Sequence, residues 1–141
     1  MKKKILIISD DPVRRDALAA LLELEGYGVV CSDAGRRASV ALATNPVSLM
    51  VVDCPARSSW LGRALRTRRT VEALTDVDAF LPLLLLCESE EELDHRTSLM
   101  ADMVLTHAVE TPALLAAIAT LLGESLRERA QRKSGHIALF R

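Results

Sequence analysis

Three residues with chemically capable side chains stand where short apolar runs of the sequence end. Asp10 and Asp53 are carboxylic acids, and Cys87 carries a thiol. Two carboxylates that meet at one edge of a sheet repel each other unless a cation lies between them. Magnesium suits such a site, because it takes one or two carboxylates and keeps water or phosphate oxygens as its other ligands. The alternative is a pair of solvated loop acids, and spacing alone leaves both interpretations open.

Five short apolar runs predict the strands that would position these residues. None of the runs alternates between apolar and polar residues, which is typical of strands buried on both faces of a parallel sheet. The runs span residues 5–8, 28–31, 49–52, 83–86 and 103–105. Asp10 follows the first run, Asp53 the third and Cys87 the fourth. The three side chains are therefore expected at the same edge of the sheet.

Helical periodicity fills the stretches between the strands. Asp11 and Pro12 are typical of an N-cap and a first helical residue, and Thr111 and Pro112 repeat that signal. Helices are predicted over residues 12–25, 35–44, 60–74, 90–100 and 111–122. The fivefold alternation predicts an α/β fold, a parallel sheet with helices on both faces. The working site of such a sheet lies past the carboxyl ends of the strands, where the strand order reverses.

The composition favours one domain and an interior rich in aliphatic side chains. The chain has 141 residues, of which 50% are hydrophobic and only 3% aromatic. A formal net charge of -1 gives no reason to expect nucleic acid or an anionic membrane as partner. No apolar run approaches the roughly 20 residues of a membrane span. The three cysteines, Cys31, Cys54 and Cys87, are widely separated and odd in number, which favours reduced thiols in the cytoplasm.

Five segments, in their order and spacing, resemble the receiver domain of two-component response regulators. They are Lys4–Pro12, Leu21–Tyr27, Leu49–Asp53, Leu81–Leu86 and Ala101–Thr106. The resemblance runs from Lys4 to about Leu122. It implies a flavodoxin-like, doubly wound sheet of five parallel strands in the order 2-1-3-4-5. We expect a receiver-like domain over residues 1–123. Residues 124–141 are expected to form a charged helical extension or linker, followed by a flexible tail from Ser134.

The resemblance also implies roles for single residues. Asp53 falls at the phosphoacceptor position, where an aspartate forms an acyl phosphate. Asp10 falls at the second acid of the pair that binds Mg²⁺. Pro55 falls where a backbone carbonyl completes the metal shell, and its ring leaves that carbonyl available.

Four positions depart from the receiver pattern. Ser9 stands in place of the first acid, and Cys87 in place of the switch hydroxyl. His107, followed by Ala108, stands in place of the phosphate-pairing lysine, and Val104 in place of the switch aromatic. A thiol is a weak hydrogen-bond donor, and a neutral imidazole carries no charge. We therefore expect weak Mg²⁺ binding and weak or absent phosphorylation of Asp53.

Two alternatives remain open on the same residues. Asp10, Asp53 and a protonated His107 would still make a working phosphoacceptor site. Asp10, Asp53, Cys87 and His107 would also serve as zinc ligands, although no close ligand spacing supports a metal-binding protein. The sequence has no glycine-rich phosphate loop and no evident nucleophile–base pair, so we do not expect an enzyme.

The sequence also offers candidate surfaces for partners. An arginine cluster is either a solvated helix face or a surface for an acidic partner, and consists of Arg57, Arg63, Arg66, Arg68 and Arg69. Trp60 is either core or an interface anchor. The resemblance implies a dimer or partner face on the fourth helix, fifth strand and fifth helix. The main hypothesis is a stand-alone, atypical receiver domain that acts in bacterial signalling by binding a kinase, a scaffold or an output protein.

Overall fold

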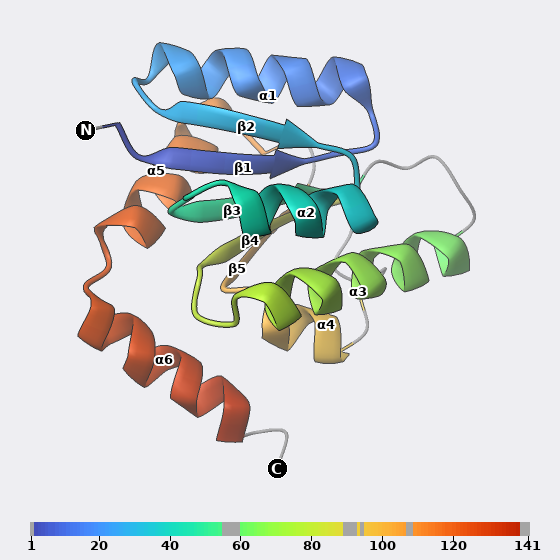
Figure 1. Ribbon diagram of the computed structural model, residues 1–141, viewed down its shortest axis with the longest axis vertical. Coiled ribbons are helices and arrows are strands. Elements are labelled where there is room, and N and C mark those ends of the chain that lie inside the picture. The colour runs from blue at the N-terminus through green and yellow to red at the C-terminus, as the bar shows by residue number, and fades with distance from the viewer. Residues whose placement is uncertain (1, 55–59, 89–92, 94, 107–108, 139–141) are drawn as a thin grey trace.

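Five parallel strands form a single sheet in the order β2-β1-β3-β4-β5 (Figure 1). The computed structural model describes residues 2–54, 60–88, 93, 95–106 and 109–138. The strands are β1 (Lys4–Ile8), β2 (Gly28–Ser32), β3 (Leu49–Asp53), β4 (Leu83–Cys87) and β5 (Met103–Thr106). This order confirms the predicted flavodoxin-like sheet. The chain reverses its direction of travel across the sheet between β1 and β3, which places the switch point there.

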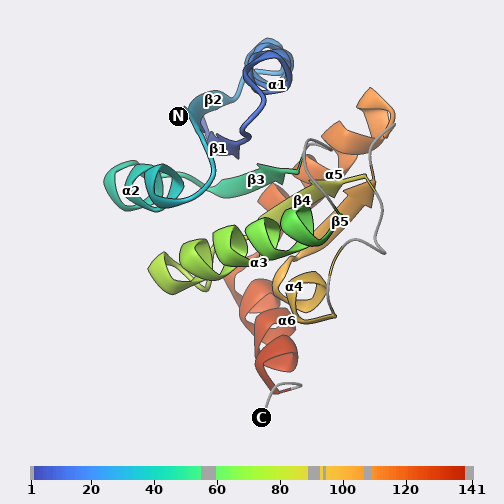
Figure 2. The same cartoon turned by 90° about the vertical axis from the view of Figure 1, so that its right-hand side faces the viewer.

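Helices cover both faces of the sheet, as the unbroken apolar runs of the strands require (Figure 2). One face carries α1 (Pro12–Leu24) and α5 (Thr111–Gly123), packed on side chains such as Ile5, Ile7 and Val51. The other face carries α2 (Arg36–Thr44), α3 (Trp60–Val77) and α4 (His95–Met100), packed on side chains such as Leu6, Val52 and Leu85. Successive residues of each strand thus serve opposite cores.

The helix that follows β1 begins where the sequence predicts. The carboxylate of Asp11 accepts hydrogen bonds from the backbone N–H groups of Val13 at 3.0 Å and Arg14 at 3.4 Å. Pro12, which has no N–H to satisfy, occupies the first helical position. Gly26, with φ of 92°, follows the end of α1. This fixes the path from the carboxyl end of β1 into α1, and so the position of the first turn.

Two helices differ in length from the prediction. α3 continues to Val77, and Asp78 follows it, accepting hydrogen bonds from the N–H groups of Phe80 and Leu81 to form the turn into β4. α4 begins at His95, whereas the prediction began at residue 90. Residues 90–92 and 94 lie outside the described part of the chain.

A further helix, α6 (Leu126–Ala138), follows α5. The prediction of a charged helical extension agrees with it, but the helix passes Ser134, where the sequence predicted a loose tail. Its basic residues make contacts at the amino end of the sheet, which hold this segment as a helix. The domain boundary at residue 123 stays a prediction. Within the described residues, no helix is both long and apolar enough to cross a membrane.

Candidate functional site

Strand register brings Ser9, and not Asp10, next to Asp53. Ile8 of β1 pairs with Val52 of β3, so the residues that follow them are neighbours at the carboxyl edge of the sheet. The Oγ of Ser9 donates a hydrogen bond to Oδ2 of Asp53 at 3.0 Å, and both residues are buried. The same oxygen accepts from the backbone N–H of Asp11 at 3.2 Å. A hydroxyl at this position therefore stabilises the Asp53 carboxylate, where a second carboxylate would repel it.

A cation from α1 neutralises the buried Asp53. The NH2 nitrogen of Arg14 lies 2.8 Å from Oδ1 of Asp53, whose side chain is 0% exposed, while that of Arg14 is 30% exposed. Arg14 stands in the first turn of α1, where the helix dipole disfavours a positive charge. The ion pair explains why an arginine is nevertheless placed there. Arg14 also lies 3.6 Å from Oε1 of Glu88, just past β4, so it spans the carboxyl edge.

The carboxylate of Asp10 contacts other residues than the carboxylate of Asp53 does. One carboxylate oxygen, Oδ1, accepts a hydrogen bond from the backbone N–H of Ala34 at 2.8 Å. The other, Oδ2, forms an ion pair with the guanidinium of Arg66 on α3. The two acids of the predicted metal pair are thus each held by an arginine of their own.

This arrangement does not fit a tightly bound Mg²⁺. A magnesium ion needs carboxylate oxygens that it can ligate directly, with water at its other positions. Here Arg14 and Ser9 occupy the two oxygens of Asp53, and Asp10 is engaged by Ala34 and Arg66. A guanidinium within ion-pair distance of Asp53 also repels a divalent cation. Pro55, whose carbonyl was predicted to complete the metal shell, lies outside the described residues.

The remaining predicted site residues are only partly described. Cys87 is buried, and its Sγ lies 4.0 Å from the carbonyl oxygen of Leu105. Val104 pairs with Leu85 and lies partly buried against the core beneath α2 and α3. His107 and Ala108 lie outside the described residues. In the part of the chain that is described, no three His, Cys, Asp or Glu side chains gather as metal ligands.

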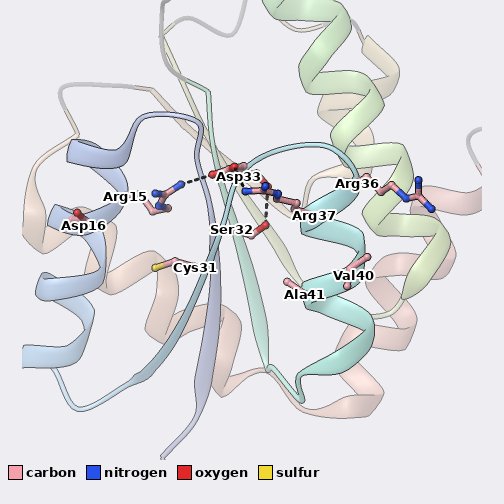
Figure 3. Close-up of a pocket in the computed structure, with 9 residues that line it drawn as sticks. All are labelled: Arg15, Asp16, Cys31, Ser32, Asp33, Arg36, Arg37, Val40 and Ala41. Carbon is pink, nitrogen blue, oxygen red and sulfur yellow. Dashed lines mark hydrogen bonds and ion pairs between the residues drawn. The ribbon is translucent and has the colours of Figure 1, made fainter.

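A pocket of about 800 Å³ lies beside the outer strand β2, between α1 and α2 (Figure 3). Asp33 holds it together by pairing with Arg15 at 2.6 Å and with Arg37 at 3.2 Å. Cys31 lines the pocket, and partial burial, opposed by the nearby charge of Arg15, raises the pKa of its thiol. The thiol is therefore a weak nucleophile at neutral pH. The charges of this pocket are largely balanced within it.

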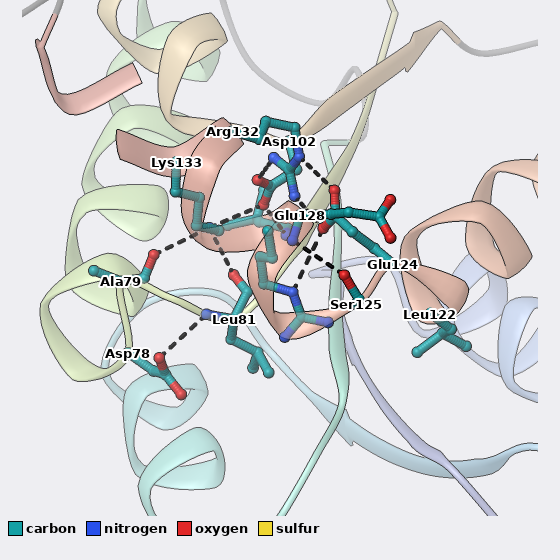
Figure 4. A network of polar contacts seen from close by, with 12 residues as sticks. Asp78, Ala79, Leu81, Asp102, Leu122, Glu124, Ser125, Glu128, Arg132 and Lys133 are labelled. Carbon is teal, nitrogen blue, oxygen red and sulfur yellow. Dashed lines mark hydrogen bonds and ion pairs between the residues drawn. The ribbon is translucent and has the colours of Figure 1, made fainter. Parts of the chain in front are cut away.

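A second buried aspartate lies at the opposite, amino edge of the sheet (Figure 4). Asp102, just before β5, has a side chain that is 1% exposed. It accepts a hydrogen bond from the N–H of Leu83 at 2.6 Å, the first residue of β4. Arg132 and Lys133 of α6 both pair with it, the latter at 3.2 Å. This carboxylate ties α6 to the two neighbouring strands.

The cations that surround Asp102 are themselves held in place. Glu124 accepts hydrogen bonds from Nε and NH2 of Arg132 at 2.8 Å and 2.7 Å. Those bonds raise the pKa of Arg132 and lower the pKa of Glu124. Lys133 donates to the carbonyl oxygens of Ala79 at 3.0 Å and Leu81 at 3.1 Å. Burial lowers the pKa of Lys133, although the charge of Asp102 opposes that shift.

Sequence reasoning missed Arg14 and the partners of Asp102. One signal pointed to Arg14, namely a basic residue in the first turn of a helix, where the helix dipole disfavours it. The arginine cluster was noticed as a surface, but the pairing of Arg66 with Asp10 was not. The network of α6 carries no local sequence signal, because its members are up to 54 positions apart.

The fold is that of receiver domains. A CheY-like receiver domain protein from Methanospirillum hungatei superposes with a TM-score of 0.71 at 22% identity, covering 93% of this chain and 98% of that chain. The response regulator TrrA from Thermotoga maritima, solved in complex with Mg²⁺-BeF, gives a TM-score of 0.69 at 20% identity over 84% of this chain and 98% of that chain. TrrA in complex with the histidine kinase ThkA likewise gives 0.69, at 22% identity over 85% of this chain and 98% of that chain.

The comparisons of sequence alone cover a smaller part of the chain. The transcriptional regulatory protein AruR from Pseudomonas aeruginosa is 37% identical over 79 residues, which cover 50% of this chain. The match takes in 32% of AruR, so this chain spans about a third of the length of that relative. No protein-family model matches the chain.

Proposed function

From the receiver fold and the occupied carboxyl edge, we propose that this chain is an atypical receiver domain of two-component signalling that works mainly by binding other proteins. Phosphorylation of Asp53 is weak or absent in this proposal, and Mg²⁺ binds weakly. One observation carries it, the ion pair at 2.8 Å between Arg14 and Asp53. The arginine supplies, within the protein itself, the positive charge that a receiver otherwise obtains from a bound cation.

The same ion pair explains how phosphorylation would be hindered. Asp53 must present a carboxylate oxygen to a phosphoryl donor, and a metal ion near that oxygen stabilises the charge that develops there. In this chain Arg14 and Ser9 hold the two oxygens, and Ser9 lacks the charge of the acid expected at its position. Because Arg14 already balances the charge of the Asp53 carboxylate, a divalent cation would bind there with little favourable electrostatic energy.

The experiment restores the acid expected at position 9 and removes the arginine that pairs with Asp53. The wild type and the double variant Ser9→Asp/Arg14→Met are incubated with Mg²⁺ and acetyl phosphate, and intact mass and peptide mapping are recorded. We expect no stoichiometric gain in the wild type and a gain of one phosphoryl group on Asp53 in the double variant. Adding Asp53→Asn to the double variant is the control and should abolish the gain.

A stoichiometric gain on Asp53 of the wild type would overturn the proposal. Circular dichroism of the double variant establishes that it is folded, so that a missing gain in an unfolded variant is not mistaken for evidence against the proposal. Magnesium affinity, measured by calorimetry on the same two proteins, should rise in the double variant. Equal affinity in both would contradict the role given to Arg14.

A working phosphoacceptor is the second candidate function. The observation that favours it is the position of Arg14, whose side chain is 30% exposed and whose guanidinium lies 2.8 Å from Asp53. Such a group would pair with a phosphoryl group formed on Asp53, in the role for which the receiver pattern has lysine and this chain has His107. In this case the Arg14→Met variant would lose the phosphorylation of Asp53 that the wild type shows. In the first proposal, the same substitution would not reduce phosphorylation of Asp53.

The proposed partners are signalling proteins. The kinase ThkA binds the structural neighbour TrrA, and by analogy a kinase, scaffold or output protein is the partner here. The face formed by α4, β5 and α5 is the proposed surface, for such a partner or for a second copy of the chain. The described cysteines are all free thiols, which favours a reducing compartment such as the cytoplasm.

A further inference from the structure

A second pocket, of about 410 Å³, lies between α2 and α3 and has a one-sided charge. Three arginines line it, Arg36 from α2 and Arg66 and Arg69 from α3. None of the described residues that line it is acidic. The pocket beside β2 differs, because Asp33 there pairs with two of the arginines. Like charges gathered in a concave space without an internal acid point to a bound anion.

Two of the three arginines have their charge available. Among the described residues, neither Arg36 nor Arg69 has an acidic partner, whereas Arg66 pairs with Asp10. Figure 3 shows the guanidinium of Arg36 pointing away from Asp33 and toward the side on which α3 lies. The planar guanidinium forks of arginine match the oxygens of a phosphate group, to which they donate two parallel hydrogen bonds.

A buried hydroxyl gives independent support. Thr70 lines the pocket and is 3% exposed. Its hydroxyl has no hydrogen-bond partner within the described part of the chain, although Thr67 and Thr75, on the same helix, both donate one. The hydroxyl is therefore available to donate a hydrogen bond to an oxygen acceptor bound in the pocket.

The amino end of α2 adds to the same attraction. Gly35, with φ of 84°, is the N-cap of α2 and provides no side-chain hydrogen bond to the first turn. The N–H groups of that turn and the positive end of the helix dipole favour an anion nearby. Both Gly35 and Arg36 line the pocket, so this end of α2 forms part of its wall.

We propose that the pocket between α2 and α3 binds a small phosphate-bearing molecule through Arg36, Arg69 and the hydroxyl of Thr70. Arg66 links this site to the candidate site, because it lines the pocket and pairs with Asp10. Ala34 links them in the same way, through its N–H on Asp10. A phosphate in the pocket competes with Asp10 for Arg66, and so loosens Asp10 from its present partners. The inference stands on these contacts and does not depend on phosphorylation of Asp53.

The test uses inorganic phosphate and pyrophosphate as probes. Thermal unfolding is followed at constant ionic strength, with chloride as the reference anion and acetate as a carboxylate. Both phosphates should raise the Tm of the wild type in a saturable way, and neither chloride nor acetate should. Isothermal titration gives the affinity of pyrophosphate.

Variants decide whether binding occurs in this pocket. Arg36→Gln/Arg69→Gln should abolish the saturable rise in Tm. The matched control, Lys2→Gln/Arg127→Gln, removes the same net charge from exposed positions elsewhere and should retain it. Thr70→Val keeps the shape of the side chain and should weaken pyrophosphate about tenfold through one lost hydrogen bond to a charged group. This third variant also decides the matter if the first does not fold.

Three outcomes would overturn the proposal. The first is a rise in Tm that does not saturate, which is the behaviour of non-specific screening. The second is a response that the pocket variants share with the control variant. The third is an equal response to acetate, which would make the pocket a general anion site without preference for phosphate.

Discussion

Two buried aspartates, at opposite edges of the sheet, are neutralised in different ways. At the carboxyl edge, the partners of Asp53 among the described residues include the guanidinium of Arg14 and the hydroxyl of Ser9. At the amino edge, Asp102 contacts two cations and a backbone N–H, from Arg132, Lys133 and Leu83. Both carboxylates are almost fully removed from water, so burial alone does not distinguish them.

The freedom of the partner to leave does distinguish them. Arg14 is 30% exposed and reaches Asp53 from the end of a helix, so it can return to water without disturbing the core. Arg132 is fixed by Glu124, and Lys133 by two backbone carbonyls. The cations of the amino-edge network are therefore held by several partners each, which indicates a structural role. At the carboxyl edge, Arg14 can leave Asp53 for another ligand, as a binding site requires.

The largest expected effect follows from breaking the amino-edge network. Asp102→Asn leaves Lys133 partly buried without its counter-charge and leaves Arg132 with Glu124 alone, which should lower the free energy of unfolding by about 3 kcal/mol. Urea denaturation followed by circular dichroism measures this change. Asp76→Asn, an exposed position on α3, is the control and should change stability by less than about 0.5 kcal/mol. A loss at Asp102 no greater than that of the control would contradict the structural role.

A smaller effect is expected at the carboxyl edge. Asp53→Asn removes the charge that Arg14 balances but keeps the shape of the side chain. Because Arg14 can turn to solvent, the free energy of unfolding should fall by only about 1 to 2 kcal/mol. The same urea titration, run beside Asp102→Asn, compares the two edges directly. If Asp53→Asn were the more destabilising of the two, the contrast between an exchangeable and a structural aspartate would be wrong.

The smallest effect concerns pH. Hydrogen bonds from Arg132, only partly opposed by burial, hold the pKa of Glu124 below its ordinary value of 4.5. Between that lowered pKa and 4.5 the unfolded chain binds more protons than the folded one, so this contribution to stability is present above 4.5 and is lost on acidification.

Glu124→Gln removes that titration. The difference in unfolding free energy between wild type and Glu124→Gln should therefore shrink as the pH falls below 4.5, the ordinary pKa of the group. Glu128→Gln, an exposed position on the same helix, serves as the control for the loss of a surface carboxylate. A difference that stays constant down to acid pH would contradict the assigned role of Glu124.

Much of the fold follows from local sequence patterns. The unbroken apolar runs at 5–8, 49–52 and 83–86 mark buried parallel strands, and the Asp11–Pro12 signal marks the start of α1. Such signals are readable because their physical causes act over a few residues. The prediction of a loose tail from Ser134 differs from the structure, in which α6 continues to Ala138, and the cause is not local. From its sequence alone, a charged segment with few apolar residues is expected to lack a fixed structure. Here its helix makes contacts with Asp102 and with the loop before β4.

The sequence by itself determined which residues stand at the carboxyl edge, because the carboxyl ends of parallel strands all lie at the same edge of the sheet. It placed Ser9, Asp10, Asp53 and Cys87 there, and the resemblance to receiver domains predicted an acid at the position that Ser9 occupies. Only the tertiary structure decided how their charges are balanced. The pairs Arg14–Asp53 and Arg66–Asp10 join residues 39 and 56 positions apart, and ion pairs of that kind depend on how helices pack over the sheet. An arginine's long side chain reaches many partners, so its sequence position does not select among them.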